Sequence, residues 1–133
     1  MPKQIPDVPN GPAALGAYSV ATEANGFVFI SGQVAIDPAT NTKVEGGVAE
    51  QTKQILANYD GILGDLGLTR DDIVKTTIFL ADIADFAEVN GIYGEYFADA
   101  KPARSTIEAG ALPGGFQVEI EAIAARGARR TQT

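Results

Sequence analysis

The first part of the chain alternates short apolar runs with turn-forming residues. Residues 17–24 and 27–31 are short and rich in strand-favouring side chains, and Asn25-Gly26 between them is a strong hairpin signal. These features predict two antiparallel strands joined by a tight turn. Residues 37–47 are polar and contain Pro38 and paired glycines, so we predict a loop there.

A different period begins at Val48. Inward-facing positions then recur at spacings of three and four, which is the pattern of an amphipathic helix. The residues on this face are Val48, Gln51, Thr52, Ile55, Tyr59, Ile62, Leu63 and Leu66. Gly67 follows the last of them and is expected to end the helix.

The next two segments predict a strand and a second helix. Residues 73–80 are short and rich in β-branched side chains, whereas residues 85–98 return to helical spacing. Asp82 and Asp85 are both candidates to cap this helix. Its expected inward side chains are Phe86, Val89, Ile92 or Tyr93, and Tyr96 or Phe97.

The chain ends in two predicted strands, residues 103–109 and 117–125, separated by a glycine-rich loop. The full order predicts one α+β domain over residues 1–133, with both helices on one face of a mixed sheet. The opposite face of the sheet must also be covered. Because no predicted helix remains for it, the expected cover is another copy of the chain.

Composition removes several kinds of chemistry. The 133 residues are 45% hydrophobic and 20% charged, as in one ordinary globular domain, and they include no cysteine and no histidine. Disulfides, thiolate metal sites, histidine-bearing zinc sites and Ser-His-Asp triads are therefore excluded. Acid–base work must fall to carboxylates, tyrosine, lysine, water or the backbone.

Charge argues against nucleic-acid partners. The net charge of −7 predicts a surface that repels phosphate backbones. The basic cluster Arg126, Arg129 and Arg130 is interpreted as a solvated tail rather than a nucleic-acid contact. No segment has the length and apolarity of a signal peptide or a membrane span, so we expect a cytoplasmic protein without a membrane partner.

The last two strands carry the most suggestive polar side chains. Alternation places Arg104, Thr106 and Glu108 on one side of their strand. In the final strand, Glu119 and Glu121 share the side opposite an apolar row, which describes either an exposed sheet face or a pocket. Arg104 could form a structural ion pair with one of these glutamates, or anchor a small anion while a carboxylate handles water.

Four blocks of sequence together resemble one known family. FISGQVAID, DIVKTTIFLADIADFAEVNGIYGEYF, KPARSTIEAGALP and VEIEAIAARG are similar, in this order, to the imine-deaminase (RidA) branch of the YjgF/Rid family. The resemblance covers the chain from about Gly16 to Arg126. It implies a chorismate-mutase-like fold and a homotrimer in which three sheets form a barrel-like core, with clefts between neighbouring subunits.

The same resemblance implies roles for individual residues. Arg104 matches the arginine that binds the substrate carboxylate, and Glu119 matches the acidic residue that orients the attacking water. Thr106 lies where many relatives have cysteine, in a segment whose backbone meets the ligand. The matching pocket-lining residues are Tyr18, Ser31, Gly32 and Asn90. Each of these four also has a purely structural interpretation at the end of an element, and Tyr93, Tyr96 and Phe97 are interpreted as core.

The implied activity is hydrolysis of 2-imino acids, 2-iminobutanoate and 2-iminopropanoate, to 2-oxo acids and ammonia. It needs neither metal nor cofactor. Three alternatives remain: a non-catalytic module of the same fold that binds small carboxylates, an endoribonuclease, and a holdase-like protein with exposed apolar surface. The acidic charge and the absence of histidine argue against the second.

Overall fold

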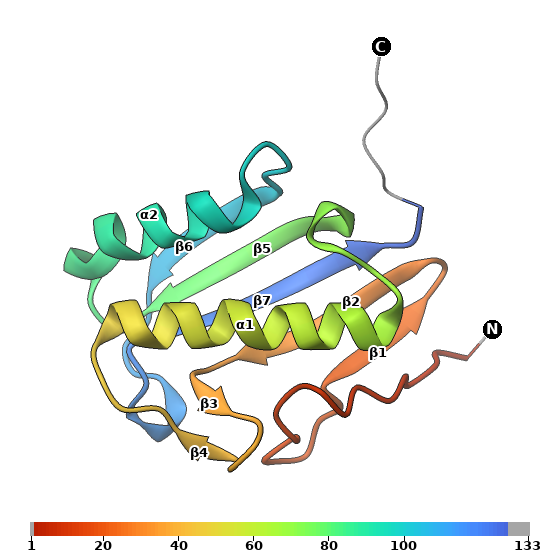
Figure 1. The fold of residues 1–133 in the computed structure, drawn as a ribbon, viewed down its shortest axis with the longest axis horizontal. Helices are drawn as coiled ribbons and strands as arrows, with labels where there is room; N and C mark the ends of the chain where they lie inside the picture. Colours follow the sequence, from red (N-terminus) through yellow and green to blue (C-terminus); the bar gives the residue numbers. More distant parts are fainter. Residues whose placement is uncertain (1, 128–133) are drawn as a thin grey trace.

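Two helices pack against one face of a five-stranded sheet in the computed structural model, which describes residues 2–127 (Figure 1). The strands lie in the order β1-β2-β7-β5-β6. They are β1 (Ala21–Ala24), β2 (Phe27–Gln33), β5 (Ile73–Leu80), β6 (Ala103–Glu108) and β7 (Val118–Ala125). The β5–β6 pair is parallel and the other pairs are antiparallel. The predicted α+β class and mixed sheet are confirmed.

The tight turn between β1 and β2 is also confirmed. Asn25 and Gly26 both have positive φ, 53° and 82°, as a two-residue hairpin turn requires. The first strand is shorter than predicted, because the chain around Tyr18 turns: the Tyr18 N–H donates to Gly16 O at 2.9 Å. The second strand is longer, since it continues to Gln33 through an irregularity in its pairing with β7.

The loop predicted at residues 37–47 contains a small hairpin. Its strands, β3 (Ile36–Asp37) and β4 (Thr42–Lys43), pair in a separate two-stranded sheet. Each has only two residues, too few for a period-2 pattern to distinguish them from loop.

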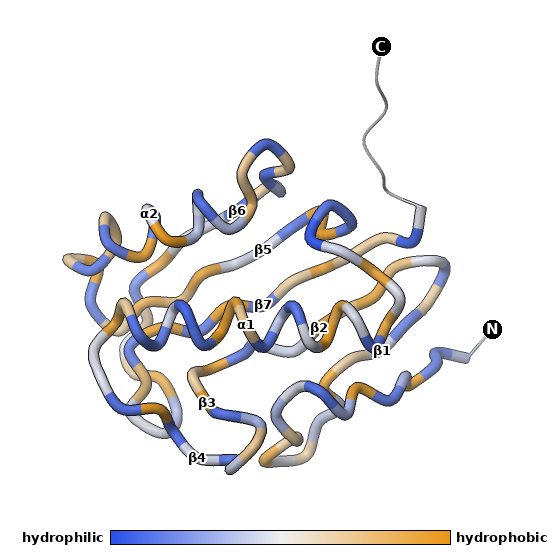
Figure 2. Tube along the Cα trace, viewed as in Figure 1, coloured by the Kyte–Doolittle hydropathy of each residue, from blue (hydrophilic) through white to orange (hydrophobic). Residues whose placement is uncertain are grey.

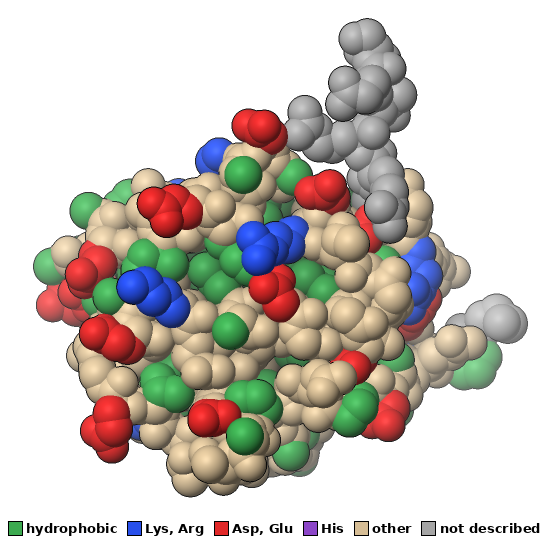
Figure 3. All heavy atoms as spheres, in the orientation of Figure 1, with side chains coloured by type: hydrophobic (Ala, Val, Ile, Leu, Met, Phe, Trp, Pro, Cys, Tyr) green, Lys and Arg blue, Asp and Glu red, His purple; other side chains and the backbone are tan. Residues whose placement is uncertain are grey.

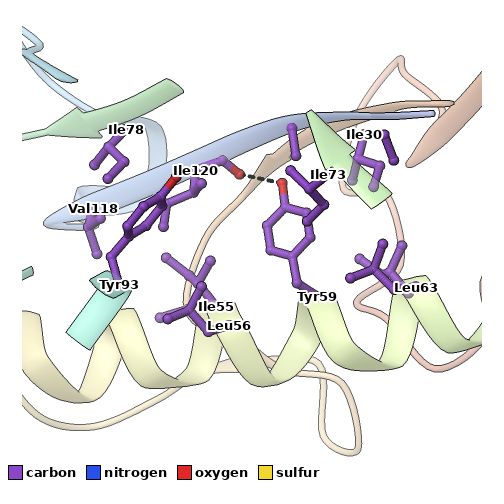
Figure 4. Packing of buried hydrophobic residues seen from close by; sticks show 14 of the residues in the cluster. Ile30, Ile55, Leu56, Tyr59, Leu63, Ile73, Ile78, Tyr93, Val118 and Ile120 are labelled. Atoms are coloured by element: carbon purple, nitrogen blue, oxygen red, sulfur yellow. Dashed lines mark hydrogen bonds between the residues drawn. The ribbon is translucent and has the colours of Figure 1, made fainter. Parts of the chain in front are cut away.

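Helix α1 (Val48–Leu66) ends at Gly67, whose φ of 72° is the left-handed cap expected there. Every predicted inward residue of this helix is buried, and hydropathy alternates along it in step with its turns (Figure 2). Ile55, Leu56 and Leu63 point toward the sheet (Figure 4). The Tyr59 hydroxyl reaches through this core and donates to Ile120 O at 2.7 Å. One polar bond therefore fixes α1 over β7.

Two glycines of α1 should respond oppositely to alanine. A Cβ at Gly61 would lie 2.7 Å from the backbone oxygen of Asn10, whereas a Cβ at Gly64 would meet nothing within 4 Å. We expect Gly61→Ala to lower the free energy of unfolding by about 1–3 kcal/mol. Gly64→Ala should raise it by up to about 1 kcal/mol through helix propensity. Urea unfolding at matched concentration checks both, and equal shifts would contradict the close approach at Gly61.

Helix α2 (Phe86–Phe97) follows a short 3₁₀ turn, Ile83–Asp85. Asp82 caps that turn by accepting from Ala84 N at 2.9 Å, while Asp85 makes no capping bond. The buried side chains of α2 are Val89, Tyr93 and Phe97. Phe86, predicted to face inward, is 36% exposed. Phe86 begins the helix, where the neighbouring 3₁₀ turn contributes no buried residue to pack over its ring.

Within residues 2–127, no helix lies on the opposite face of the sheet (Figure 1). In β7 the predicted apolar row is buried beneath the helices, which leaves Glu119 and Glu121 on the other side. Phe27 and Phe29 of β2, each 44% exposed, and Ile107 of β6, 48% exposed, lie on this uncovered face. Its cover by a second copy of the chain stays a prediction.

Few basic side chains of the described residues are placed to bind a polyanion together. Arg126 pairs with Glu23 through two bonds of 2.7 and 3.0 Å, and Arg129 and Arg130 lie outside the described residues. On the helix-covered side, acidic side chains are spread over the face and basic ones stand apart from one another (Figure 3). Among the helices at residues 2–127, none has the length and apolarity to cross a membrane.

Candidate active site

A pocket of about 440 Å³ opens at one end of the sheet. Its lining is mostly apolar and comes from the segment before β1, from β2, from the loop before β7 and from β7 itself. The lining residues are Leu15, Tyr18, Ser31, Gly32, Val34, Pro113, Gly114, Phe116 and Glu119. The structure thus brings together four of the residues that the sequence singled out, Tyr18, Ser31, Gly32 and Glu119.

Gly32 lies directly against the Glu119 carboxylate. A Cβ at position 32 would be 2.1 Å from Glu119 Oε2 and 2.8 Å from its Cδ, so no other residue fits without moving the carboxylate. This close approach falls where the β2–β7 pairing is irregular, between Ile30 and Gln33. Irregularities of this kind re-aim side chains next to active sites. Gly32 therefore has a steric role and is more than a strand end.

Ser31 fixes the other wall of the same pocket. Its Oγ donates to Ser19 O at 2.7 Å, and its N–H donates to Val20 O at 2.9 Å. These bonds tie the segment that carries Tyr18 to β2. The Tyr18 hydroxyl accepts from Leu15 N at 3.3 Å, and the side chain is 50% exposed, so the phenol borders the pocket opening.

The small β3–β4 hairpin supports the loop that closes the pocket. Lys43 Nζ donates to Gly115 O at 3.1 Å and lies 4.8 Å from the centroid of the Phe116 ring. Gly114 and Gly115 both have positive φ, 83° and 72°, so the turn that carries Pro113 and Phe116 needs glycine at these positions. The sequence predicted loops in both places but not that they contact each other.

The environment of Glu119 favours its protonated form. Partial burial raises the pKa of the Glu119 carboxyl, and the neighbouring Glu121 carboxylate raises it further. No cation of the described residues pairs with Glu119. A carboxylate that is partly desolvated and unpaired in a pocket is a candidate general base.

Arg104 lies in a second pocket, of about 320 Å³, beside α2. The lining residues are Asn90, Tyr93, Gly94, Lys101, Pro102 and Arg104. Arg104 Nη1 donates to Asn90 Oδ1 at 2.8 Å. The guanidinium carbon lies 4.9 Å from the Tyr93 ring centroid and 5.6 Å from that of Phe86. Asn90, expected to line a pocket, therefore lies beside Arg104 and away from the pocket of Glu119.

Arg104 and Glu119 lie on opposite faces of the sheet within one chain. Arg104 is in register with Thr76, whose hydroxyl is bonded to Tyr93 on the helix side. Glu119 is in register with Phe79, on the uncovered side. The alternative in which Arg104 forms an ion pair with Glu119 or Glu121 of its own chain is therefore wrong. The alternation within each strand was predicted correctly, but the relation between the two strands was not.

Thr106 belongs to neither pocket lining. It is in register with Ile78, and its Oγ1 is buried with no hydrogen-bond partner in the part of the chain that the structure describes. The sequence also missed Leu15, Val34, Pro113 and Phe116. Pro113 and Phe116 lie just before the strand of Glu119, and this position was the signal that could have identified these two residues.

Comparison with known proteins shows which family the chain belongs to. The family model described as Endoribonuclease L-PSP matches residues 8–126. A Mus musculus protein named 2-iminobutanoate/2-iminopropanoate deaminase is 45% identical over 94% of this chain and 93% of its own.

Solved structures give the same result. The structure of YyfA from Yersinia pestis, described as a protein of unknown function of the conserved Rid family, is 46% identical and has a TM-score of 0.89, covering 93% of this chain and 99% of its own. E. coli TdcF with bound serine is 34% identical, with a TM-score of 0.86 over 93% of this chain and 99% of that one. The chain belongs to the Endoribonuclease L-PSP family, which is the YjgF/Rid family that its sequence resembles.

Proposed function

We propose that this protein hydrolyses 2-imino acids, in particular 2-iminobutanoate and 2-iminopropanoate, to 2-oxo acids and ammonia. The observation that carries the proposal is the Glu119 carboxylate, which has a raised pKa, lies against Gly32 in a largely apolar pocket and has no cationic partner among residues 2–127. The name of the Mus musculus relative supports the same activity.

We propose further that the complete site forms between copies in a homotrimer. Arg104 and Glu119 of one chain line different pockets on opposite faces of the sheet. A small imino acid cannot reach both unless the arginine comes from one copy and the carboxylate from a neighbour. The exposed Phe27, Phe29 and Ile107 on the uncovered face support such packing, because large exposed apolar side chains gathered on one face are typical of interfaces.

These residues suffice for the reaction. Arg104 binds the substrate carboxylate through its planar N–H fork, which places C2 of the imine near Glu119. The ionised Glu119 stabilises the positive iminium form and accepts a proton as water adds to C2. Glu119 returns this proton to the nitrogen of the resulting carbinolamine. The C–N bond then breaks as the hydroxyl loses a proton to Glu119, which gives the oxo acid and ammonia.

The pH profile should report the raised pKa of Glu119. The base works when ionised, so kcat/KM should fall as pH drops through this pKa, at a higher pH than an ordinary glutamate would give. Glu121→Gln removes the neighbouring charge and should move the acidic limb to lower pH. Steady-state kinetics from pH 4 to 7 measure the acidic limb of the wild type and that of Glu121→Gln. If the two limbs coincide, Glu121 does not affect the group that titrates.

The proposal is tested by a coupled assay. An amino-acid oxidase or a threonine dehydratase generates the imine, and its trapping by semicarbazide is followed with and without the protein. A loss of semicarbazone that depends on this protein supports imine hydrolysis. Unchanged trapping with folded protein would refute it.

Two observations concern activities other than imine hydrolysis. The E. coli TdcF structure, 34% identical, contains bound serine, which favours small-carboxylate binding without turnover as the second candidate. The family description names an endoribonuclease, but a net charge of −7 is unfavourable for a polyanionic substrate. Binding of 2-oxobutanoate without imine turnover would support the carboxylate-binding module. Cleavage of RNA would support the endoribonuclease.

A further inference from the structure

Helix α2 presents Phe86, Asn90 and Tyr93 at positions i, i+4 and i+7, which share one stripe of a helix. All three contact the Arg104 guanidinium: Asn90 accepts from Nη1, and the two aromatic rings lie 5.6 and 4.9 Å from Cζ. We propose that Phe86 and Tyr93 form an aromatic cradle that positions Arg104 to bind carboxylates. Tyr93 is thereby a positioning residue as well as a core residue. The proposal rests on the proposed function.

The Tyr93 ring is fixed from the other side of the core. Its hydroxyl lies 2.6 Å from Thr76 Oγ1, and Tyr93 is 3% exposed. Thr76 is the β5 residue in register with Arg104. Arg104 and the Tyr93 ring are therefore both positioned next to Thr76 of β5. An arginine side chain held in this way loses less freedom when a ligand binds, which favours binding.

A second arginine in the chain shows what such an arrangement binds. Arg70 stacks on Tyr96 of the same helix at 3.9 Å, and its Nε and Nη2 bind the two oxygens of Asp60 at 3.1 and 3.0 Å. Arg104 has a similar tyrosine contact, but its one described hydrogen-bond partner is the neutral amide of Asn90, at Nη1. Within residues 2–127, the Nε and Nη2 edge of Arg104 has no hydrogen-bond partner.

Unlike Arg70, Arg104 is therefore arranged to bind a carboxylate that comes from outside the chain. Asn90 occupies one edge of the guanidinium without neutralising it, and the guanidinium carbon lies over the Phe86 and Tyr93 rings. The edge that Arg70 uses for Asp60 is left for a ligand at Arg104. A carboxylate of a 2-imino or 2-oxo acid has the two-oxygen geometry that this edge requires.

The test compares Tyr93→Leu with Phe97→Leu. Phe97 lies one turn further along α2, is 4% exposed, and packs on Tyr93 without contacting Arg104. It thus matches the loss of core packing. Calorimetric titration with 2-oxobutanoate measures carboxylate binding without turnover, and the coupled imine assay gives KM and kcat. Circular dichroism confirms that each variant is folded.

We expect Tyr93→Leu to raise the Kd for 2-oxobutanoate and the KM by about 3-fold to 30-fold, with kcat nearly unchanged. Tyr93→Phe keeps the ring and should restore most of the affinity, and Phe97→Leu should leave Kd near the wild-type value. Should Tyr93→Leu fail to fold, Phe86→Leu at the 36% exposed ring is expected to weaken binding in the same direction.

Equal Kd values for Tyr93→Leu and the wild type, or equal weakening by Phe97→Leu, would overturn the cradle. Wild-type protein that binds 2-oxobutanoate but hydrolyses no imine would overturn the proposed function and leave the cradle standing. If the wild type does not bind 2-oxobutanoate at all, the cradle fails too.

Discussion

Arg104→Ala is expected to lower kcat/KM for imine hydrolysis by about 100-fold or more, because the carboxylate of the substrate loses its charged partner. The variant should fold, since Arg104 is only partly buried and its bonded partner Asn90 is exposed and able to bind water. The coupled semicarbazide assay measures the loss. Retained activity would remove Arg104 from the site.

Trimers mixed from two variants test whether Arg104 and Glu119 of one site come from different chains. Glu119→Gln alone should keep 2-oxobutanoate binding but slow turnover. If trimers of Arg104→Ala and Glu119→Gln are dissociated together and reassembled, random mixing places an intact arginine opposite an intact glutamate at about one quarter of the sites. Activity should return to about that fraction. A mixture as inactive as its parents, with subunit exchange verified by mass spectrometry, would contradict a shared site.

Gly32→Ala is expected to lower kcat by about 10-fold to 100-fold. The added methyl group would overlap the position of the Glu119 carboxylate, 2.1 Å from Oε2, and must push it away from the position in which we propose that it activates water. Gly32 lacks a positive φ, so its backbone tolerates alanine, and unfolding measurements should show little loss of stability.

Gly110→Ala is the matched control, because a Cβ there meets nothing within 4 Å and its φ is also not positive. It should keep wild-type kcat. Equal kcat values for the two variants would show that the carboxylate is free to move, and Gly32 would then be only part of the strand.

Much of the fold could be predicted because its signals are local. The buried stripe of α1 and the apolar row of β7 follow from spacing alone, and Gly67 and Asn25-Gly26 follow from backbone conformations that few other residues adopt. The hairpin of β3 and β4 could not be predicted in this way, since two-residue strands carry no period.

The candidate site was less predictable because it depends on register. Alternation tells which residues of one strand share a face, but the relative phase of β6 and β7 is set by their separate pairings with β5. Arg104 and Glu119 therefore looked like neighbours on pattern alone and lie on opposite faces. Similarly, Tyr93 was interpreted as core. That interpretation is correct for its burial but incomplete, because its ring also contacts Arg104.

The placement of Arg104 and Glu119 on opposite faces has a consequence for how the protein is handled at low concentration. If each site needs two chains, specific activity follows mass action: it should stay constant above the dissociation constant of the assembly and decline on dilution below it. An isolated chain, even perfectly folded, would be inert. Rates measured on very dilute protein would then report the supply of assembled sites rather than the speed of the chemistry.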